Sequence, residues 1–242
     1  GATTPWLTER HGYDPTWDLN LAIRPGEKVA LVGESGSGKS TLAKLLCGLL
    51  KYDAGSILLD GTELRELRLN SLYEYLGYIS QDAPVFDGTL RENLDFGEGA
   101  SDEGLRRAME KARFLSVYEK LPNGLETRLG ERGVLLSGGE RQRAALVRLF
   151  LEQKDMIILD EATSAMDNLT EEAVAGEIFS SWKEKTVICV AHRLSSVRGC
   201  DRIIAMKEGQ IVGDGAFEEL LESCEYFRTL YEAGEEGKPC LN

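Results

Sequence analysis

The sequence predicts an α/β fold built on a mostly parallel sheet. Strand-like apolar runs alternate with helix-like segments along the chain, which is typical of this class. One long stretch, from about Asp82 to about Lys154, is mostly helical and carries no strong strand signal. The simplest arrangement is a helical lobe inserted into a parallel-sheet core. The core strands are expected at four apolar runs: Lys28–Val32, Met156–Leu159, Thr186–Val190 and Ile203–Ala205.

The first elements follow one another closely. Lys28–Val32 leads at once into a glycine-rich turn, and Ser40–Leu50 has apolar residues at helical spacing. Ile57–Leu59 is expected to be a strand, and Asp60-Gly61 after it is a turn dipeptide. Tyr78–Ser80 is expected to be a further short strand.

Capping residues mark where helices begin. Thr89 and Ser101 each stand before a helical pattern. Ser137 and Glu140 form an S-x-x-E capping box ahead of a longer helix. Another helix is expected to start at Asn168.

Composition narrows the class of protein. The chain has 242 residues and a net charge of −13, with 42% hydrophobic and 29% charged residues, as in ordinary globular proteins. The acidic balance argues against a nucleic-acid partner, whose binding surface would be basic. No apolar run approaches the roughly 20 residues of a membrane-spanning helix. Five scattered cysteines without a C-x-x-C pair favour a reducing cytosolic compartment over a disulfide framework or a zinc site.

The first chemical motif follows the first core strand. Gly33-Glu34-Ser35-Gly36-Ser37-Gly38-Lys39-Ser40 matches G-x-x-x-x-G-K-[ST] between a strand and a helix. Glycines let the backbone wrap a phosphate with its N–H groups pointing inward, and the helix N-terminus adds a positive dipole end. Lys39 would reach the β- and γ-phosphates of a nucleotide, and the Ser40 hydroxyl would coordinate Mg²⁺.

The second motif is an apolar strand that ends in two carboxylates, Asp160 and Glu161. Asp160 would hold Mg²⁺, directly or through water, and Glu161 would polarise the attacking water. Alone the motif is weak, because many buried strands end in an acid. Beside a phosphate loop in one parallel sheet it becomes strong, since ligands bind at the carboxyl edge.

The third motif is Leu136–Gln142, with the sequence LSGGERQ. A helix cap explains Ser137 and Glu140, but not the two glycines, which weaken a helix. Glycines at a helix start expose backbone N–H groups and make a second phosphate-binding surface. With these three motifs in this order, the chain resembles the nucleotide-binding domain of an ABC (ATP-binding cassette) transporter, from about Tyr13 to about Tyr231.

The resemblance implies a P-loop NTPase (RecA-like) core, a small antiparallel β lobe and the inserted helical lobe. The whole chain, 1–242, would be one ATP-binding domain, with its core at about 13–81 and 155–231 and its helical lobe at about 82–154. The bound species would be ATP and Mg²⁺.

The resemblance also assigns roles residue by residue. Gln81 resembles the Q-loop glutamine, Ser164–Asp167 the D-loop and His192 the switch histidine that contacts the γ-phosphate. The implied catalytic residues are Glu161, His192, Gln81 and Lys39, and the implied metal ligands are Ser40, Gln81 and Asp160. The implied nucleotide-binding residues are Tyr13, Gly33, Glu34, Ser35, Gly36, Ser37, Gly38, Lys39, Ser40, Thr41, Ser137, Gly138, Gly139 and Glu140. Tyr13 is the best match for the aromatic that stacks on adenine, with Trp6 and Trp17 as rivals.

Two segments favour an exporter. Gly130-Glu131-Arg132-Gly133 resembles the exporter X-loop, and Pro84–Asn93 resembles the exporter segment after the Q-loop. Either stretch alone could be a solvated loop. The resemblance implies an ATP-hydrolysing motor at the cytoplasmic face of a membrane, whose closure on ATP drives a membrane domain, fused or separate. The motor would be a homodimer or heterodimer that sandwiches ATP, with Ser137 and Gly139 completing the partner's site.

Two other functions compete with this one. A cassette ATPase acting on nucleic acid or ribosomes would carry coiled coils, tandem cassettes or basic patches, and a net charge of −13 has the wrong sign. A nucleotide switch that binds without hydrolysis is the least favoured, because the Glu161 and His192 positions are filled.

Overall fold

A computed structural model describes residues 2–3, 18–52, 54–131 and 133–236. The chain forms two compact units. The first contains Gly1–Tyr78, Asp155–Asp160 and Glu184–Asn242, and the second contains Ile79–Lys154 and Glu161–Lys183. Within the described ranges, no helix combines the length and apolar character needed to cross a membrane.

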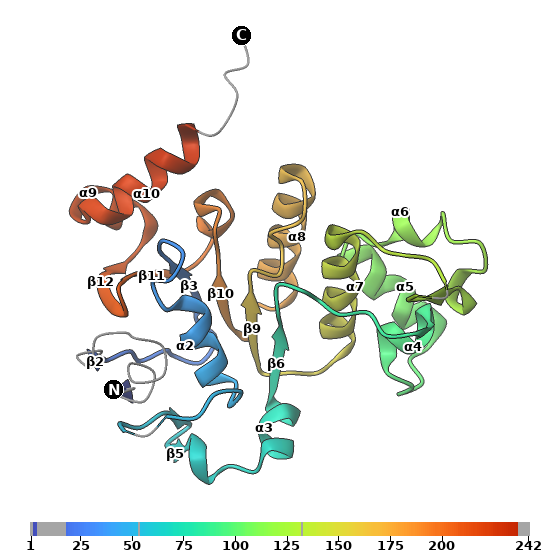
Figure 1. Ribbon diagram of the computed structural model, residues 1–242, viewed down its shortest axis with the longest axis horizontal. Helices are drawn as coiled ribbons and strands as arrows, with labels where there is room; N and C mark the ends of the chain where they lie inside the picture. The colour runs from blue at the N-terminus through green and yellow to red at the C-terminus, as the bar shows by residue number, and fades with distance from the viewer. Residues whose placement is uncertain (1, 4–17, 53, 132, 237–242) are drawn as a thin grey trace. The chain divides into compact units, whose positions relative to one another are not determined.

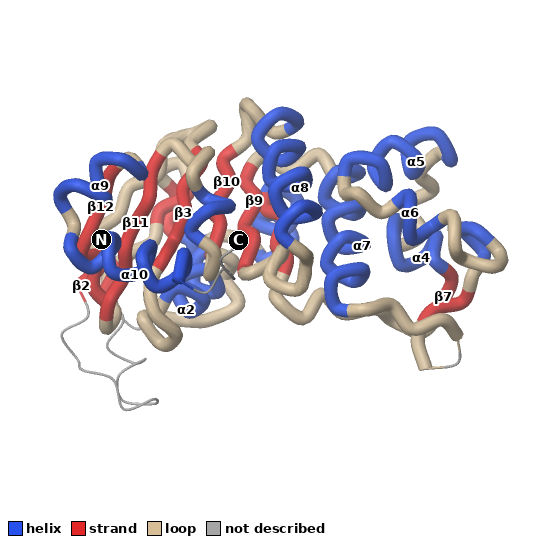
Figure 2. Tube along the Cα trace, turned by 90° about the horizontal axis from the view of Figure 1, so that it is seen from above, coloured by secondary structure: helices blue, strands red, loops and turns tan. Residues whose placement is uncertain are grey.

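A six-stranded sheet forms the centre of the first unit, in the order β12-β11-β3-β10-β9-β6. The pairs β11–β3, β3–β10 and β10–β9 are parallel, and β11–β12 is antiparallel. Figure 2 shows most of these strands side by side, in red. Their bounds are β3 Lys28–Val32, β6 Leu76–Ile79, β9 Met156–Asp160, β10 Thr186–Val190, β11 Arg202–Lys207 and β12 Gln210–Gly215.

The register brings the carboxyl ends of three strands to one edge. Val190 of β10 lies opposite Leu31 of β3 on one side and Asp160 of β9 on the other. The residues that follow β3, β9 and β10 therefore start at the same level of the sheet. In parallel α/β sheets this edge is where ligands bind.

The remaining elements of the first unit surround this sheet. Helix α2 packs against β9 and β10, and α9 and α10 lie beside β12 (Figure 1). Two small antiparallel pairs, β1–β2 and β4–β5, accompany the main sheet, as expected for a small antiparallel lobe. The bounds are β1 Ala2–Thr3, β2 Asp18–Leu19, α2 Lys39–Leu46, β4 Leu58–Leu59, β5 Thr62–Glu63, η1 Leu64–Glu66, α3 Leu69–Tyr75, η3 Leu194–Val197, α9 Phe217–Ser223 and α10 Glu225–Glu236.

The core of the first unit explains why α2 lies where it does. Leu42 and Leu45 of α2 are buried in one cluster with alternate residues of the strands, among them Val29, Leu31 and Ile188. Val29 and Leu31 are two positions apart in a strand, so their side chains lie on one face of the sheet. Leu42 and Leu45 are three positions apart in a helix, so they lie on one side of α2. The apolar stripe thus fixes the helix that begins at the phosphate loop.

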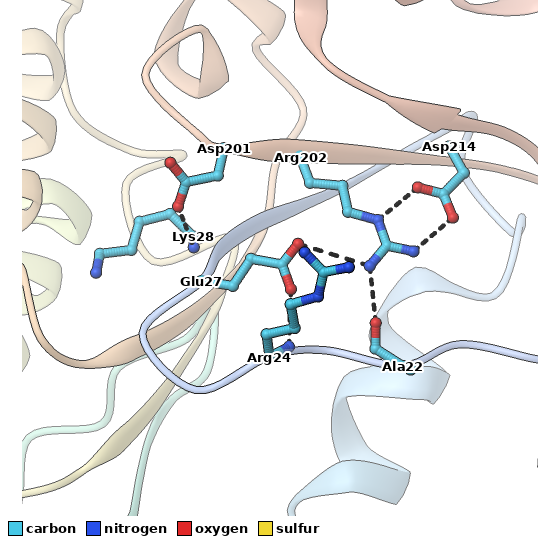
Figure 3. A network of polar contacts seen from close by, with 7 residues as sticks. All are labelled: Ala22, Arg24, Glu27, Lys28, Asp201, Arg202 and Asp214. Carbon is cyan, nitrogen blue, oxygen red and sulfur yellow. Dashed lines mark hydrogen bonds and ion pairs between the residues drawn. The ribbon is translucent and has the colours of Figure 1, made fainter.

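Arg202 links several segments at the opposite end of β11 (Figure 3). Its guanidinium forms a bidentate pair with Asp214 of β12, donates to the carbonyl of Ala22 and lies 3.6 Å from the Glu27 carboxylate. Asp201 accepts from the backbone N–H of Lys28 over 2.9 Å. The planar, five-donor guanidinium is suited to several partners at once.

The second unit contains eight elements among its described residues. Helix α7 packs against α4 and α5. The cap expectations are confirmed at Thr89, Ser101 and Ser137, each of which accepts a backbone N–H. The bounds are β7 Gly88–Thr89, α4 Leu90–Asp95, α5 Asp102–Lys111, α6 Leu115–Tyr118, η2 Gly124–Glu126, β8 Arg128–Leu129, α7 Gly138–Leu151 and α8 Asn168–Ser181.

The structure corrects several expected boundaries. The strand placed at Tyr78–Ser80 is Leu76–Ile79, and the helix placed at Ser40–Leu50 ends at Leu46. Helix α8 does begin at Asn168 as expected, and the residue that caps it is Asp167, whose carboxylate accepts the Thr170 N–H over 2.9 Å.

Candidate functional site: a phosphate loop and its carboxylates

Gly33 starts the phosphate loop immediately after β3. A Cβ at this position would lie 2.2 Å from the carbonyl oxygen of Met206, so only glycine fits. Gly38 has φ 103° and precedes α2, a conformation that L side chains rarely adopt. These two glycines let the loop pass close to β11 and then turn into the helix. The other loop residues are Glu34, Ser35, Gly36 and Ser37, followed by Lys39, Ser40 and Thr41 of α2.

Lys39 is buried beneath the loop, with 4% of its surface exposed. Its ammonium donates to the carbonyl oxygens of Gly33 (2.6 Å) and Glu34 (2.9 Å) and lies 3.3 Å from the Ser37 hydroxyl. An ammonium has three donors and strong charge, so a phosphate oxygen could replace these carbonyls as its partner. The loop therefore holds a cation where a phosphate would enter.

Ser40 and Asp160 meet on neighbouring elements of the first unit. The Ser40 hydroxyl donates to Oδ1 of Asp160 over 2.9 Å, and the hydroxyl of Tyr78 donates to Oδ2 over 3.1 Å. Burial raises the pKa of Tyr78, and the adjacent Asp160 raises it further, so this phenol stays a donor. Tyr78 was not identified from the sequence, because a single tyrosine at a strand end gives no motif.

A hydroxyl and a carboxylate fit Mg²⁺. This ion takes oxygen ligands and is usually held by one or two carboxylates together with substrate phosphates. Ser40 and Asp160 are close enough to share one ion beside the phosphate loop. The donor set is therefore compatible with the metal that the motifs imply.

Residues of β11 and α10 support the phosphate loop from outside. The backbone N–H of Glu34 donates to the Tyr226 hydroxyl, which donates to the carbonyl of Met206, both over 3.0 Å. The N–H of Gly209 donates to the Ser37 carbonyl over 3.0 Å. The sequence alone does not reveal these contacts, because they depend on which distant segments the sheet brings beside the loop.

His192 follows β10 at the same sheet edge. The N–H of Ala191 donates to the carbonyl of Leu31 over 3.2 Å, which continues the pairing of β10 with β3. His192 is exposed there, one residue beyond that bond and at the level where the phosphate loop begins. Its position in the first unit is compatible with contact to a terminal phosphate.

The second unit carries the remaining motif residues. Ser137 caps α7 and forms the capping box with Glu140, whose carboxylate accepts the Ser137 N–H over 2.8 Å. Gly138 and Gly139 form the first turn, and a Cβ on Gly139 would lie 2.8 Å from the Ala165 carbonyl oxygen. The glycines thus allow α7 to begin against the turn at Ser164–Asp167.

Gln81 and Glu161 also belong to the second unit. The Gln81 side chain is exposed, and Glu161 is partly buried with φ 54°, in the left-handed region. The backbone carbonyls of both residues accept from the side-chain amide of Gln142, over 3.1 and 3.2 Å. Tyr13, Trp6 and Trp17, the candidates for stacking on adenine, lie outside the described residues.

The two exporter-like segments line one groove in the second unit, with a volume of about 780 Å³. Buried Asn93 holds the backbone between the lining residues Val85 and Asp87, because its side chain bonds the N–H and the carbonyl of Phe86, each over 3.0 Å. The groove is lined by Asp82, Pro84, Val85, Asp87, Gly130, Glu131, Val134, Leu135, Leu136 and Arg141.

Comparison with known proteins agrees with this geometry. The family model for ABC transporters matches residues 17–164. An ATP-dependent lipid A-core flippase of Pseudomonas fluorescens is 41% identical over 229 residues, which cover 94% of this chain and 38% of the flippase. The heterocyst differentiation ATP-binding protein HepA of Nostoc is 39% identical, over 90% of this chain and 37% of that protein. The chain thus spans well under half the length of these relatives.

A solved structure is similar as well. The structure of a bacterial Atm1-family ABC exporter with ATP bound aligns with a TM-score of 0.82 and 34% identity, over 87% of this chain and 37% of the exporter chain. The family match covers more than half of the chain and includes the phosphate loop, the α7 motif and the two carboxylates. The chain therefore belongs to the ABC transporter family, as a nucleotide-binding domain of the exporter type.

Proposed function

We propose that this chain binds Mg²⁺-ATP and hydrolyses it as the motor of an ABC exporter. The observation that carries the proposal is the shared sheet edge of β3, β9 and β10. It brings the phosphate loop, Asp160 and His192 to one level of the first unit, with Ser40 bonded to Asp160. A phosphate loop, a metal-binding pair and a phosphate-sensing imidazole are the parts that phosphoryl transfer to water requires.

Each residue would have a distinct role. Lys39 would exchange its loop carbonyls for β- and γ-phosphate oxygens, and the loop N–H groups would bind the remaining oxygens. Ser40 and Asp160, assisted by Gln81, would hold Mg²⁺, which when bound neutralises charge that develops on the phosphates. Glu161 would accept a proton from the attacking water, and His192 would bind the γ-phosphate.

The N-terminus of α7 would serve a second copy of the domain. Ser137 is exposed, and Gly138 and Gly139 leave backbone N–H groups accessible at the start of a 14-residue helix. These groups would bind the γ-phosphate of an ATP molecule held by the partner. Two ATP molecules would then be enclosed by a homodimer or heterodimer, and the dimer would open after hydrolysis.

The groove between the exporter-like segments would receive the membrane domain. Leu135 on its wall is 77% exposed and offers apolar surface to a partner. Asp82, Asp87 and Glu131 add negative charge at its rim. A short membrane-domain element with an apolar face and basic residues would fit, at the cytoplasmic face of the membrane.

Phosphate release from ATP by this chain tests the proposal. The wild type should turn over ATP in the presence of Mg²⁺, and Lys39→Ala should abolish detectable binding and turnover. Lys44→Ala, which removes an exposed lysine from the same helix, is the matched control and should retain the wild-type rate. Wild-type protein that binds ATP but releases no phosphate would contradict the proposed hydrolysis and support a binding-only switch.

A further inference from the structure

The side chain of Gln142, in the second unit, has four hydrogen-bond partners. It lies on α7 one turn after the glycines, and 1% of its surface is exposed. Its amide nitrogen lies 3.1 Å from the Gln81 carbonyl oxygen, 3.2 Å from the Glu161 carbonyl oxygen and 3.1 Å from the Ser164 hydroxyl. Its oxygen accepts the Ala165 N–H over 3.0 Å. Through this one buried side chain, α7 is therefore joined to two other segments, at Gln81 and at the Glu161–Ala165 turn.

Both hydrogens of this amide nitrogen are engaged. An amide nitrogen has two hydrogens, so three acceptors within 3.2 Å share them. A buried donor or acceptor without a partner is costly, and this cost fixes the side chain in one orientation. The three segments are consequently held in one arrangement by a single group.

The contact with Glu161 falls where the backbone is strained. Glu161 has φ 54°, which a residue with a side chain adopts only when its surroundings impose it. Its carbonyl oxygen accepts the Ser164 N–H over 3.1 Å in addition to the Gln142 amide. Removing the amide would take away one of the hydrogen bonds that hold this strained peptide, so the direction of the Glu161 carboxylate would be less firmly set.

The packing of α7 against the Ser164–Ala165 turn supports the link between Gln142 and Glu161. The space that a Cβ on Gly139 would need is taken by the Ala165 carbonyl oxygen, so the helix start and the turn are in direct contact. Gln142 bonds the N–H of the same Ala165 from the next turn of the helix. Movement of the Ser164–Ala165 turn would therefore displace the Gln142 side chain, which also bonds the Glu161 carbonyl.

We infer that Gln142 is a positioning residue for hydrolysis. It acts through its side-chain amide by fixing the Glu161 backbone, the Gln81 carbonyl and the Ser164–Ala165 turn in one arrangement. The inference rests on the proposed function and predicts a defect in the chemical step rather than in ATP binding. Misplacement of a catalytic group by about 1 Å is enough to slow a reaction by about 100-fold.

The test measures the ATP dissociation constant and kcat of the 242-residue chain. Gln142→Met keeps the length of the side chain and removes every hydrogen bond. We expect kcat to fall at least about tenfold while the dissociation constant stays within about threefold, since Lys39 and the phosphate loop are unchanged. Gln153→Met, at an exposed glutamine of the same unit, is the matched control and should change neither quantity.

Gln142→Glu adds a readout that a space-filling role would not produce. An ionised carboxylate would face the Gln81 and Glu161 carbonyl oxygens without a donor, whereas the protonated form regains one O–H donor. Burial favours the protonated form, so the kcat of this variant relative to wild type should rise at least about threefold between about pH 8.5 and about pH 6. For Gln142→Met, the same ratio should not depend on pH.

The possible results separate a failure of the inference about Gln142 from a failure of the proposed ATP hydrolysis. Wild-type turnover with a Gln142→Met kcat within about twofold would overturn the inference alone, as would a fall in kcat accompanied by a flat pH ratio for Gln142→Glu. If Gln142→Met does not bind ATP, the test is the kcat of Gln142→Glu relative to wild type: a rise toward about pH 6 supports the inference and a flat ratio overturns it. If neither variant binds ATP, Gln142 serves folding and the inference is wrong. Absence of wild-type turnover would contradict the proposed function itself.

Discussion

The Ser40 hydroxyl donates a hydrogen bond to Oδ1 of Asp160 over 2.9 Å, although 120 positions separate the two residues in the chain. Ser40 is on the helix that follows β3, and Asp160 ends β9, with β10 between these strands. The parallel register of the three strands is what brings the two oxygens together. The first unit alone therefore brings together the two residues proposed to hold Mg²⁺.

Metal dependence is the first prediction. Chelation of divalent ions should abolish turnover, and Mg²⁺ should restore it. The proposed reaction uses a Mg²⁺ ion, held by Ser40, Asp160 and the substrate phosphates, to neutralise the charge on those phosphates. Ser40→Ala removes one oxygen ligand and should raise the Mg²⁺ concentration for half-maximal turnover at least about tenfold. Phosphate release across a Mg²⁺ titration measures this shift. Ser71→Ala, an exposed serine on α3, should leave the titration unchanged.

Tyr78→Phe tests the second donor to Asp160. Loss of the phenol leaves Oδ2 of a buried carboxylate without this partner, and hydrogen bonds to charged groups contribute about 1.5–3 kcal/mol. We expect a lower unfolding temperature and a several-fold lower kcat, because Asp160 is less firmly oriented. Calorimetry and phosphate release measure the two effects. An unchanged rate would show that Ser40 alone is enough to orient this carboxylate.

Tyr226→Phe tests the support of the phosphate loop by α10. The hydroxyl bridges the Glu34 N–H and the Met206 carbonyl, so its removal leaves two backbone groups without this partner. The expected cost is about 1–2 kcal/mol in the free energy of unfolding, with weaker ATP binding, since the loop loses an anchor. Denaturant titration and ATP titration measure these quantities. Tyr231→Phe on the same helix is the control, and equal effects of the two variants would argue against the bridge.

Two glycine substitutions in the second unit should have opposite signs. Gly139→Ala places a Cβ 2.8 Å from the Ala165 carbonyl oxygen and should lower both the unfolding temperature and kcat. Gly176→Ala, within α8, has nothing within 4 Å of the new methyl group. It should stabilise the protein by up to about 1 kcal/mol, because alanine loses less backbone entropy in a helix. Thermal unfolding distinguishes them; stabilisation by Gly139→Ala would show that α7 and the turn are not in firm contact.

Local patterns predicted much of this fold. As expected, the phosphate loop lies between β3 and α2, Thr89 caps α4 and the Ser137 capping box forms, because each depends on residues within a few positions of one another. The two-residue strands β7 and β8 were missed, since two residues cannot show a period. At α8, Asp167 and Asn168 are both good caps, and only the backbone geometry decides between them.

The supporting residues of the site were harder to predict. Tyr78 and Tyr226 donate to groups far away in the chain, and Gln142 joins three segments, so none of them is marked by local spacing. The sequence identified the residues expected to touch nucleotide and metal, whose roles remain predictions. The side chains that hold those residues became visible only through the packing.

Glu161→Gln gives the most direct test of the central proposal, that Glu161 activates the water which hydrolyses ATP. A neutral amide cannot accept the proton, so turnover should fall at least about 100-fold while the ATP dissociation constant stays within about threefold. Glu172→Gln, at an exposed glutamate of α8, should retain both wild-type values. A Glu161→Gln variant that releases phosphate at the wild-type rate would contradict the account.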